Sequence, residues 1–233
     1  MKKTLLFITL FLGISKTLIC QNIVYSDNFT QGISNWTIEA ESDSSIIKTE
    51  DGALEIIAPK GLTLWFNKSL ETGIKISFDA FIINNKGKFD RISDLNCFWM
   101  ANDPENPNDF FARSKWRQGT FGKYYSLTMY YVGYGGNNNT TSRFRKYDGS
   151  YEGFKNKATR PDIIKEYNDS AHLIVPNKWD HIEIVMNRNN IKYIFNNETL
   201  FDYNDTTPYN KGYFGLRTVT NHMKIKDFEV RKL

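Results

Sequence analysis

Residues 73–81 read Gly-Ile-Lys-Ile-Ser-Phe-Asp-Ala-Phe, and an apolar side chain stands at every second position through most of the stretch. A period of two puts the apolar side chains on one face of an extended strand and the polar side chains on the other. Residues 179–186 repeat this alternation through Ile182, Ile184 and Met186. Both stretches therefore predict strands that are buried on one face only.

Turn-forming asparagines separate the strands that follow. They stand at residues 187–190 and again at 196–197, and asparagine tolerates the left-handed backbone conformation that tight turns need. We expect the returning strands at residues 191–195, 199–203, 212–218 and 223–230. No long helical periodicity and no internal repeat accompanies them, and no linker divides the chain. The predicted fold is all-β: one domain over residues 21–233, a two-sheet antiparallel jelly-roll sandwich.

Length and composition fit this fold and narrow the function. The 233 residues include 13 Tyr, 17 Phe and 5 Trp, enough rings to fill a two-sheet core and still supply a ligand face. The formal net charge is +4, and no block of Lys and Arg is long enough to follow a phosphate backbone. We therefore predict no nucleic-acid partner, whereas an acidic polysaccharide is compatible with a mildly basic surface.

The first twenty residues have the features of an export signal. Lys2 and Lys3 form a positive end, and residues 5–14 are an apolar run too short for a permanent transmembrane helix. Cleavage near Cys20 would release a secreted or periplasmic protein. Lipidation of Cys20, which normally follows a small residue rather than Ile19, would instead give an outer-membrane lipoprotein. No transmembrane segment is predicted in the mature chain.

Metal and cofactor sites have little support in the sequence. Beyond Cys20, the only cysteine is Cys97, so no disulfide or thiolate metal site is predicted, and its strand-like surroundings indicate a buried structural thiol. The three histidines lack metal-ligand spacing. Asp27, residues 103–109 and Asp227 offer oxygen ligands for a structural calcium ion but form no fixed-spacing motif. We predict no cofactor and no metal site.

Several local patterns resemble the concanavalin A-like lectin/glucanase superfamily. They are residues 25–29 (Tyr-Ser-Asp-Asn-Phe) with Asn35 and Trp36, residues 51–56 (Asp-Gly-Ala-Leu-Glu-Ile), residues 179–184 with 196–198, residues 212–217 (Gly-Tyr-Phe-Gly-Leu-Arg) and residues 225–230. Together they cover nearly the whole mature chain. The resemblance implies a jelly roll that meets carbohydrate.

The middle of the chain is similar to a narrower group. Residues 98–101 (Phe-Trp-Met-Ala), 113–119 and 133–145 resemble uncharacterised galectin-like proteins that accompany pectin and rhamnogalacturonan utilisation systems. The resemblance implies an acidic plant or algal polysaccharide or oligosaccharide as partner. It carries no established catalytic residue.

Residues 133–145 contain the strongest candidates for ligand contact. The glycines and asparagines of this segment permit a tight turn. Beyond the turn Arg143, Arg145 and Tyr147 alternate, so they share one face of a strand while Phe144 faces away. Two adjacent guanidinium groups suit a carboxylate, because an arginine fork binds it with two hydrogen bonds.

The preceding and following strands supply further candidates. In residues 124–131 we expect Tyr124 and Tyr130 to line an open concave surface, and Tyr125 and Tyr131 to face the core. Arg217 shares a face with Tyr213, and His222 follows at the next turn. The remaining candidate sugar contacts are Asn96, Trp116, Tyr134, Asn138, Tyr147 and Tyr213.

Three functions compete. A lyase acting on a uronic-acid-containing glycan is favoured: Arg143, Arg145 or Arg217 would neutralise the carboxylate, His222 or a tyrosine would take the proton, and Tyr124 or Tyr130 would protonate the leaving oxygen. A non-catalytic carbohydrate-binding protein fits the same residues. The third alternative is a glycoside hydrolase using Asp90, Asp94 or Asp148, although no strand carries the paired acids of a retaining glucanase.

Overall fold

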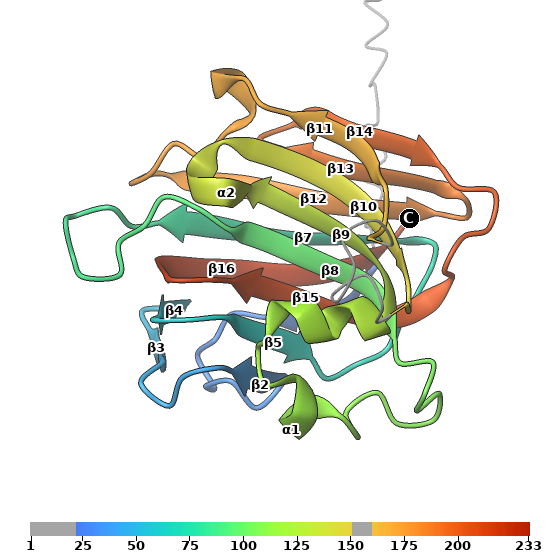
Figure 1. Cartoon of the computed structure of the whole chain (residues 1–233), viewed down its shortest axis with the longest axis horizontal. Coiled ribbons are helices and arrows are strands. Elements are labelled where there is room, and N and C mark those ends of the chain that lie inside the picture. The colour runs from blue at the N-terminus through green and yellow to red at the C-terminus, as the bar shows by residue number, and fades with distance from the viewer. Residues whose placement is uncertain (1–21, 151–159) are drawn as a thin grey trace, which may run out of the picture.

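The computed structural model describes residues 22–150 and 160–233 as two antiparallel sheets stacked face to face (Figure 1). The back sheet has the order β14 (Glu198–Asn204), β13 (Asn190–Phe195), β12 (Trp179–Asn187), β7 (Ile74–Ile82), β16 (Asn221–Lys232), β4 (Ala53–Ala58) and β3 (Ile46–Glu50), and β1 (Ile23–Asp27) also pairs with β16. The front sheet has the order β11 (Ile163–Tyr167), β10 (Thr141–Asp148), β9 (Thr128–Gly135), β8 (Leu95–Asn102), β15 (Lys211–Thr218), β5 (Leu62–Phe66) and β2 (Trp36–Ala40), and β6 (Leu70–Glu71) also pairs with β15. With eight strands in each sheet, the predicted all-β sandwich is confirmed.

The core lies between the two sheets and follows the alternation in the sequence. On β7, Ile76, Phe78 and Ala80 are buried, and Phe78 pairs in register with Ile182 of β12. Burying side chains of this size stabilises the fold by about 1.5–3 kcal/mol each. Cys97 of β8 is fully buried in the same core, and burial raises the pKa of its thiol well above the ordinary value. It is a structural thiol, as predicted.

Strand β9 differs from the prediction both in the residue at which it begins and in which of its side chains point into the core. Residues Phe121–Ser126 form a 3₁₀ helix, η1, and β9 begins only at Thr128. Along β9, Tyr130 and Tyr134 point into the inter-sheet core, whereas Tyr131 lies on the outer face of the front sheet. The prediction that Tyr130 would line the outer surface and Tyr131 the core was therefore wrong. Tyr130 and Tyr134 can be buried because their hydroxyls have acceptors: Tyr130 donates to Asp205 at 2.6 Å, and Tyr134 donates to the Leu173 carbonyl at 3.1 Å.

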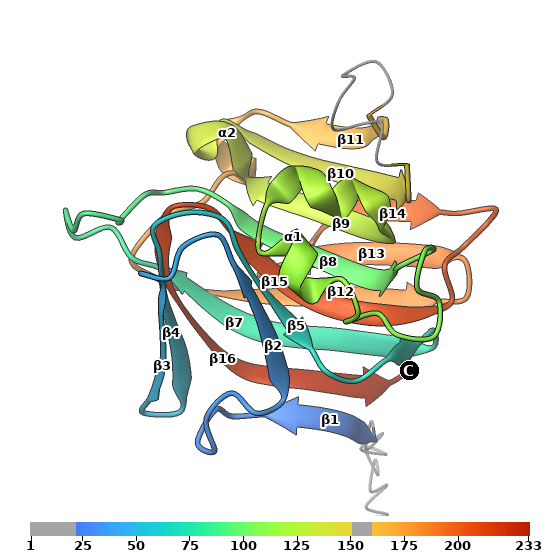
Figure 2. The same cartoon turned by 60° about the horizontal axis from the view of Figure 1, so that its bottom comes forward.

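A long connection between β8 and β9 covers part of the outer face of the front sheet. This cover segment, residues 103–127, contains the helical turn α1 (Ser114–Arg117) and η1, and Figure 2 shows both lying over the strands of the front sheet. Its side chains form a second hydrophobic cluster with the sheet, in which Trp65 and Phe98 from the strands meet Phe110 and Tyr124. The cover segment is thus a packed part of the fold.

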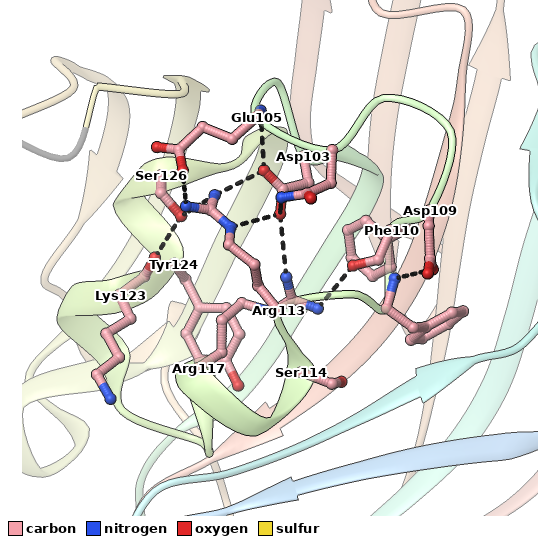
Figure 3. Close-up of polar contacts among 12 residues, drawn as sticks. Asp103, Glu105, Asp109, Phe110, Arg113, Ser114, Arg117, Lys123, Tyr124 and Ser126 are labelled. Carbon is pink, nitrogen blue, oxygen red and sulfur yellow. Dashed lines mark hydrogen bonds and ion pairs between the residues drawn. The ribbon is translucent and has the colours of Figure 1, made fainter.

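A buried polar network anchors the cover segment to β2, and further polar contacts join residues within the segment (Figure 3). Arg117 is fully buried and forms an ion pair with Glu39 at 2.8 Å, and the Tyr124 hydroxyl donates to the same carboxylate at 2.6 Å. At the start of the segment, Arg113 donates to both oxygens of Asp103, at 2.7 and 2.6 Å. Because each buried charge has an opposite charge beside it, the segment is held in one position.

The predicted export signal, residues 1–20, lies outside the described residues. Within them, no helix combines the length and the apolar character needed to cross a membrane. The remaining short elements are α2 (Gly136–Asn139), a turn between β9 and β10, and η3 (Ser170–His172).

Candidate functional site

A pocket of about 340 Å³ opens on the outer face of the front sheet, beside the cover segment. Its floor consists of strand residues with short or flat side chains, among them Asn96 of β8 and Gly133 of β9. The residues that line it are Arg91, Asp94, Asn96, Phe121, Tyr125, Tyr131, Gly133, Gly136, Asn137, Thr141, Arg143, Arg145, Tyr147, Arg160, Arg217 and Val219. These come from four neighbouring strands and from the loops at both strand ends.

Positive charge dominates this pocket. Of the described residues that line it, five are arginines and a single one, Asp94, is acidic. Asp94 forms an ion pair with Arg91 at 2.8 Å, through the same oxygen that accepts from Ser93. The lining therefore has four more guanidinium groups than carboxylates, an arrangement that attracts an anion.

The two arginines of β10 lie where the alternation predicted. Arg143 and Arg145 face the pocket, while Phe144 between them is buried in the core. Arg143 forms an ion pair with Glu166 of the neighbouring strand β11, and Arg145 donates to the Pro161 carbonyl. Since a guanidinium group has five N–H donors, both arginines keep donors for a ligand.

Arg217 is held rigidly at the edge of the pocket. Its Nη1 donates to the Gly119 carbonyl at 2.7 Å and to the Thr63 hydroxyl at 3.1 Å. The guanidinium carbon lies 5.0 Å from the ring centres of both Phe121 and Tyr124. Arg217 thus joins β15 to the cover segment, and its orientation is fixed before any ligand arrives.

Three buried polar atoms of lining residues have no hydrogen-bond partner among the described residues: Nε of Arg217, Oδ1 of Asn96 and the Tyr147 hydroxyl. Arg217 and Asn96 pair directly across β15 and β8. The two residues are only 3% and 2% exposed, so a missing partner is costly unless water or a ligand supplies it.

The Tyr131 hydroxyl lies over the middle of the floor. A Cβ atom added at Gly133 would be 2.3 Å from this oxygen, so the glycine makes room for the phenol. Burial, and the nearby charge of Asp94, raise the pKa of Tyr131 far above its ordinary value, against the opposing effect of Arg217 and Arg145. The phenol therefore stays protonated at neutral pH and acts as a hydrogen-bond donor.

The pocket brings together five of the predicted site residues. They are Asn96, Arg143, Arg145, Tyr147 and Arg217. Tyr147 is 1% exposed, and its ring stacks on Tyr125 with the ring centres 5.1 Å apart. Whether these residues act on a ligand stays a prediction.

The structure places the other predicted residues elsewhere. Tyr130 and Tyr134 point into the core, as described above. Tyr124 belongs to the cover segment and is buried on its inner side against Glu39, and Tyr213 stacks on Phe110 of that segment at 4.5 Å. Their rings are used for packing, because the cover segment occupies the surface on which they were expected to meet sugar.

His222 lies on the opposite side of the sandwich from the pocket. It belongs to β16 of the back sheet, where its two ring nitrogens contact Asp90 at 2.9 Å and Glu55 at 2.8 Å. Its strand neighbour Met223 points into the core, so His222 faces outward from the back sheet. The prediction that His222 would join the arginines was wrong, because the chain crosses from one sheet to the other between β15 and β16.

Two predicted contacts lie at the margin of the site. Asn138 accepts a hydrogen bond from Nε of Arg91 at 2.8 Å and so supports a lining residue. Trp116 lies on α1, 38% exposed, with Arg113 and Lys123 against its ring. It does not line the pocket.

Sequence reasoning missed Tyr131, Tyr125, Phe121, Arg91 and Arg160 as lining residues. The signal for Tyr131 was Gly133, two positions along the same strand face, because a glycine on a sheet surface leaves space that a neighbouring ring can fill. Arg91 and Asp94 were visible as a polar alternation leading into β8. The described residues contain no group of three or more His, Cys, Asp or Glu side chains placed to hold a metal ion.

Comparison with known proteins places the chain in a family. Residues 56–228 match the domain of unknown function DUF6250, and the chain belongs to this family. A search of curated proteins finds no match.

Solved structures with a similar fold are numerous. A Bacillus subtilis protein of unknown function with a galectin-like fold shares 16% identity at a TM-score of 0.70, over 91% of this chain and 97% of that one. The carbohydrate-binding module CBM66 from Bacillus subtilis shares 12% identity at 0.55, over 86% and 98%. A laminarinase from Flavobacterium sp. UMI-01 shares 14% identity at 0.58, over 91% and 100%. The predicted galectin-like, concanavalin A-like jelly roll is confirmed, and at these identities the likeness concerns the fold alone.

Proposed function

We propose that this member of the DUF6250 family binds an acidic carbohydrate, with a uronic acid residue seated in the front-sheet pocket. The observation that carries the proposal is the set of five arginines that line the pocket beside a single lining carboxylate, Asp94. Arginine is the side chain best suited to a carboxylate, and the partly exposed Tyr131 offers an aromatic ring for the apolar side of a pyranose. The carbohydrate-binding and glucan-degrading proteins that share this fold support a carbohydrate ligand.

The binding test uses isothermal titration with polygalacturonate, rhamnogalacturonan and alginate, with sulfated carrageenan and neutral laminarin as comparisons. We expect the carboxylated glycans to bind and laminarin not to bind. Arg145→Gln should weaken binding at least tenfold, about 1.4 kcal/mol, because it removes a charge-assisted hydrogen bond. Arg188→Gln, the same change at an exposed turn between β12 and β13, is the matched control and should leave affinity unchanged. Equal affinity for laminarin, or equal loss in both variants, would refute the proposal.

β-Elimination is the second candidate, and the presence of Tyr131, Asp94 and several arginines in one pocket favours it. In this reaction a base removes the proton from C5 of the uronic acid, the C–H electrons form a C4–C5 double bond, and the C4–O bond breaks. An arginine would neutralise the carboxylate, and Tyr131 would give its proton to the departing oxygen. Asp94 is the lining carboxylate available as base, since its contacts with Arg91 and Ser93 both use Oδ2.

Ultraviolet absorbance separates the two candidates, because the new double bond is conjugated with the carboxylate. A rise on incubation with an acidic glycan, abolished by Tyr131→Phe without loss of affinity, would establish the lyase. A flat trace with binding intact leaves a carbohydrate-binding protein. New reducing ends without absorbance would instead indicate a hydrolase. Of the three acids named for that role, only Asp94 lines the pocket, while Asp90 contacts His222 on the back sheet.

A further inference from the structure

The shape of the pocket restricts which part of a glycan can enter it. A site that binds the middle of a polysaccharide needs a groove in which the chain enters at one side and leaves at the other. The outer face of the front sheet runs from β11 to β2 and is broad enough for such a groove. The walls around the pocket therefore decide between recognition of internal residues and recognition of an end.

The cover segment closes the side of the pocket toward β5 and β2. Trp65 of β5 is fully buried beneath it, and Glu39 of β2 is 2% exposed. Arg117 and Phe110 of the segment pack directly on these two residues, at 2.8 Å from Glu39 and 4.8 Å from the Trp65 ring. No sugar chain can continue across the sheet here without expelling a buried ion pair.

Loops close the pocket at one end of the strands. Arg91 ties three of them together, since it donates to Asn138 of the α2 turn, to the Val219 carbonyl after β15 and to Asp94, each at 2.8 Å. Asn137 of the same turn also lines the pocket. This end is therefore a wall held by one guanidinium group.

The opposite strand end is closed by η1. Phe121 and Tyr125 of this helix line the pocket, and Tyr125 stacks on Tyr147 of β10. Phe121 also contacts the Tyr131 ring, with the centres 5.9 Å apart. Aromatic rings thus fill the space through which a chain would otherwise run parallel to the strands.

The remaining side, along β10 and β11, is the more open one among the described residues. Here Arg143 and Glu166 form their ion pair with side chains 31% and 30% exposed. Arg117 and Glu39, under the cover segment, are by contrast inaccessible. Among the described residues, this is therefore the side over which a longer ligand can extend.

The volume agrees with a short ligand. A uronic acid residue has roughly twelve non-hydrogen atoms. If each takes about 15 Å³, which is half the volume of a water molecule in the liquid, the residue needs on the order of 180 Å³. The pocket of about 340 Å³ therefore has room for at least one such residue.

From these walls we infer that the pocket recognises the end of an acidic oligosaccharide and encloses its last one or two residues, with the rest of the chain leaving over β10 and β11. This inference rests on the proposed function. It adds that the ligand is a chain terminus, so that each glycan molecule binds one protein per suitable end whatever its length.

The test is a titration with galacturonic acid, its oligomers of two to six residues, and polygalacturonate of known chain number. We expect the dissociation constant, counted per molecule, to improve from one to two residues and then to change less than twofold up to six. Polygalacturonate should bind in proportion to its number of chains. Borohydride reduction of the reducing end, and oligomers with a 4,5-unsaturated non-reducing end, then identify which terminus enters.

Two results separate failure of the inference from failure of the proposed function. Affinity that improves more than tenfold between two and six residues, or many proteins bound along one polymer chain, would overturn end recognition while the proposed function stands. Absence of binding by every acidic glycan, monomer to polymer, would overturn the proposed function and the inference with it.

Discussion

Replacement of Arg117 by methionine removes the cation that holds the cover segment on the front sheet. Arg117 donates to Glu39 through Nε at 3.0 Å and to the Phe110 carbonyl through Nη2 at 3.0 Å. Methionine fills a similar volume but leaves the Glu39 carboxylate buried beside Tyr124 without its counter-charge. Breaking a buried pair in this way costs about 3–5 kcal/mol, and for a domain of this size each kcal/mol lowers Tm by about 2–4 °C. We therefore expect Tm to fall by roughly 6–20 °C.

The measurement is thermal unfolding of the variant by circular dichroism, with urea unfolding as a second probe. Arg231→Met is the matched control, because Arg231 pairs with Glu229 at 2.6 Å while both side chains remain about a third exposed. A surface pair of this kind contributes at most about 1 kcal/mol. A Tm within 2 °C of the parent for Arg117→Met, or equal losses in the two variants, would show that the Glu39–Arg117 pair does not hold the cover segment.

Three further predictions concern the pocket and the back sheet. Gly133→Ala should lower glycan affinity at least tenfold, because the new Cβ would push the Tyr131 ring and hydroxyl out of their present position; unchanged titration curves would contradict it. Trp116→Ala should leave affinity within twofold, whereas Phe121→Ala, inside the pocket, should reduce it by more than fivefold in the same titration. Burial alone raises the pKa of Glu55 and Asp90, yet hydrogen bonds, including those from His222, bring each pKa below its ordinary value of 4.5 or 3.8. Their contribution to stability is therefore complete above those values and lost as the pH falls through the lower folded-state values. His222→Gln should flatten the decline of Tm between about pH 5 and 3 without changing glycan affinity at pH 7, and an unchanged decline would rule this explanation out.

The strand faces that the sequence predicted correctly are those with a strong contrast between neighbours. In residues 141–148, charged Arg143 and Arg145 flank apolar Phe144, and no other assignment buries the ring and leaves the guanidinium groups accessible. The same contrast placed Arg217 opposite Leu216, which lies in the core. Where polar and apolar side chains alternate cleanly, burial energy alone chooses the face.

The same contrast could not predict which side chains of β9 point into the core. Residues 124–131 read Tyr-Tyr-Ser-Leu-Thr-Met-Tyr-Tyr, so both faces carry rings and the difference between them is small. What decides the facing is a pair of distant acceptors, Asp205 for Tyr130 and the Leu173 carbonyl for Tyr134, which satisfy the two buried hydroxyls. Their positions depend on the tertiary fold. A local pattern contains no information about them.

The cover segment limited the prediction of the site more than any single residue did. The sequence predicted an open concave surface, and Tyr124, Tyr213 and Trp116 were assigned to sugar contacts. In the structure the segment covers part of that face, so the first two rings pack beneath or within it, and the outer surface of the segment carries the third. Arg143 and Arg145 face the pocket as predicted because they lie on β10, beside the cover segment and not under it. The same segment that removed the tyrosines from the site also turned a broad face into a pocket with walls, and for this reason the length of the bound oligosaccharide is the property that now tests the site most directly.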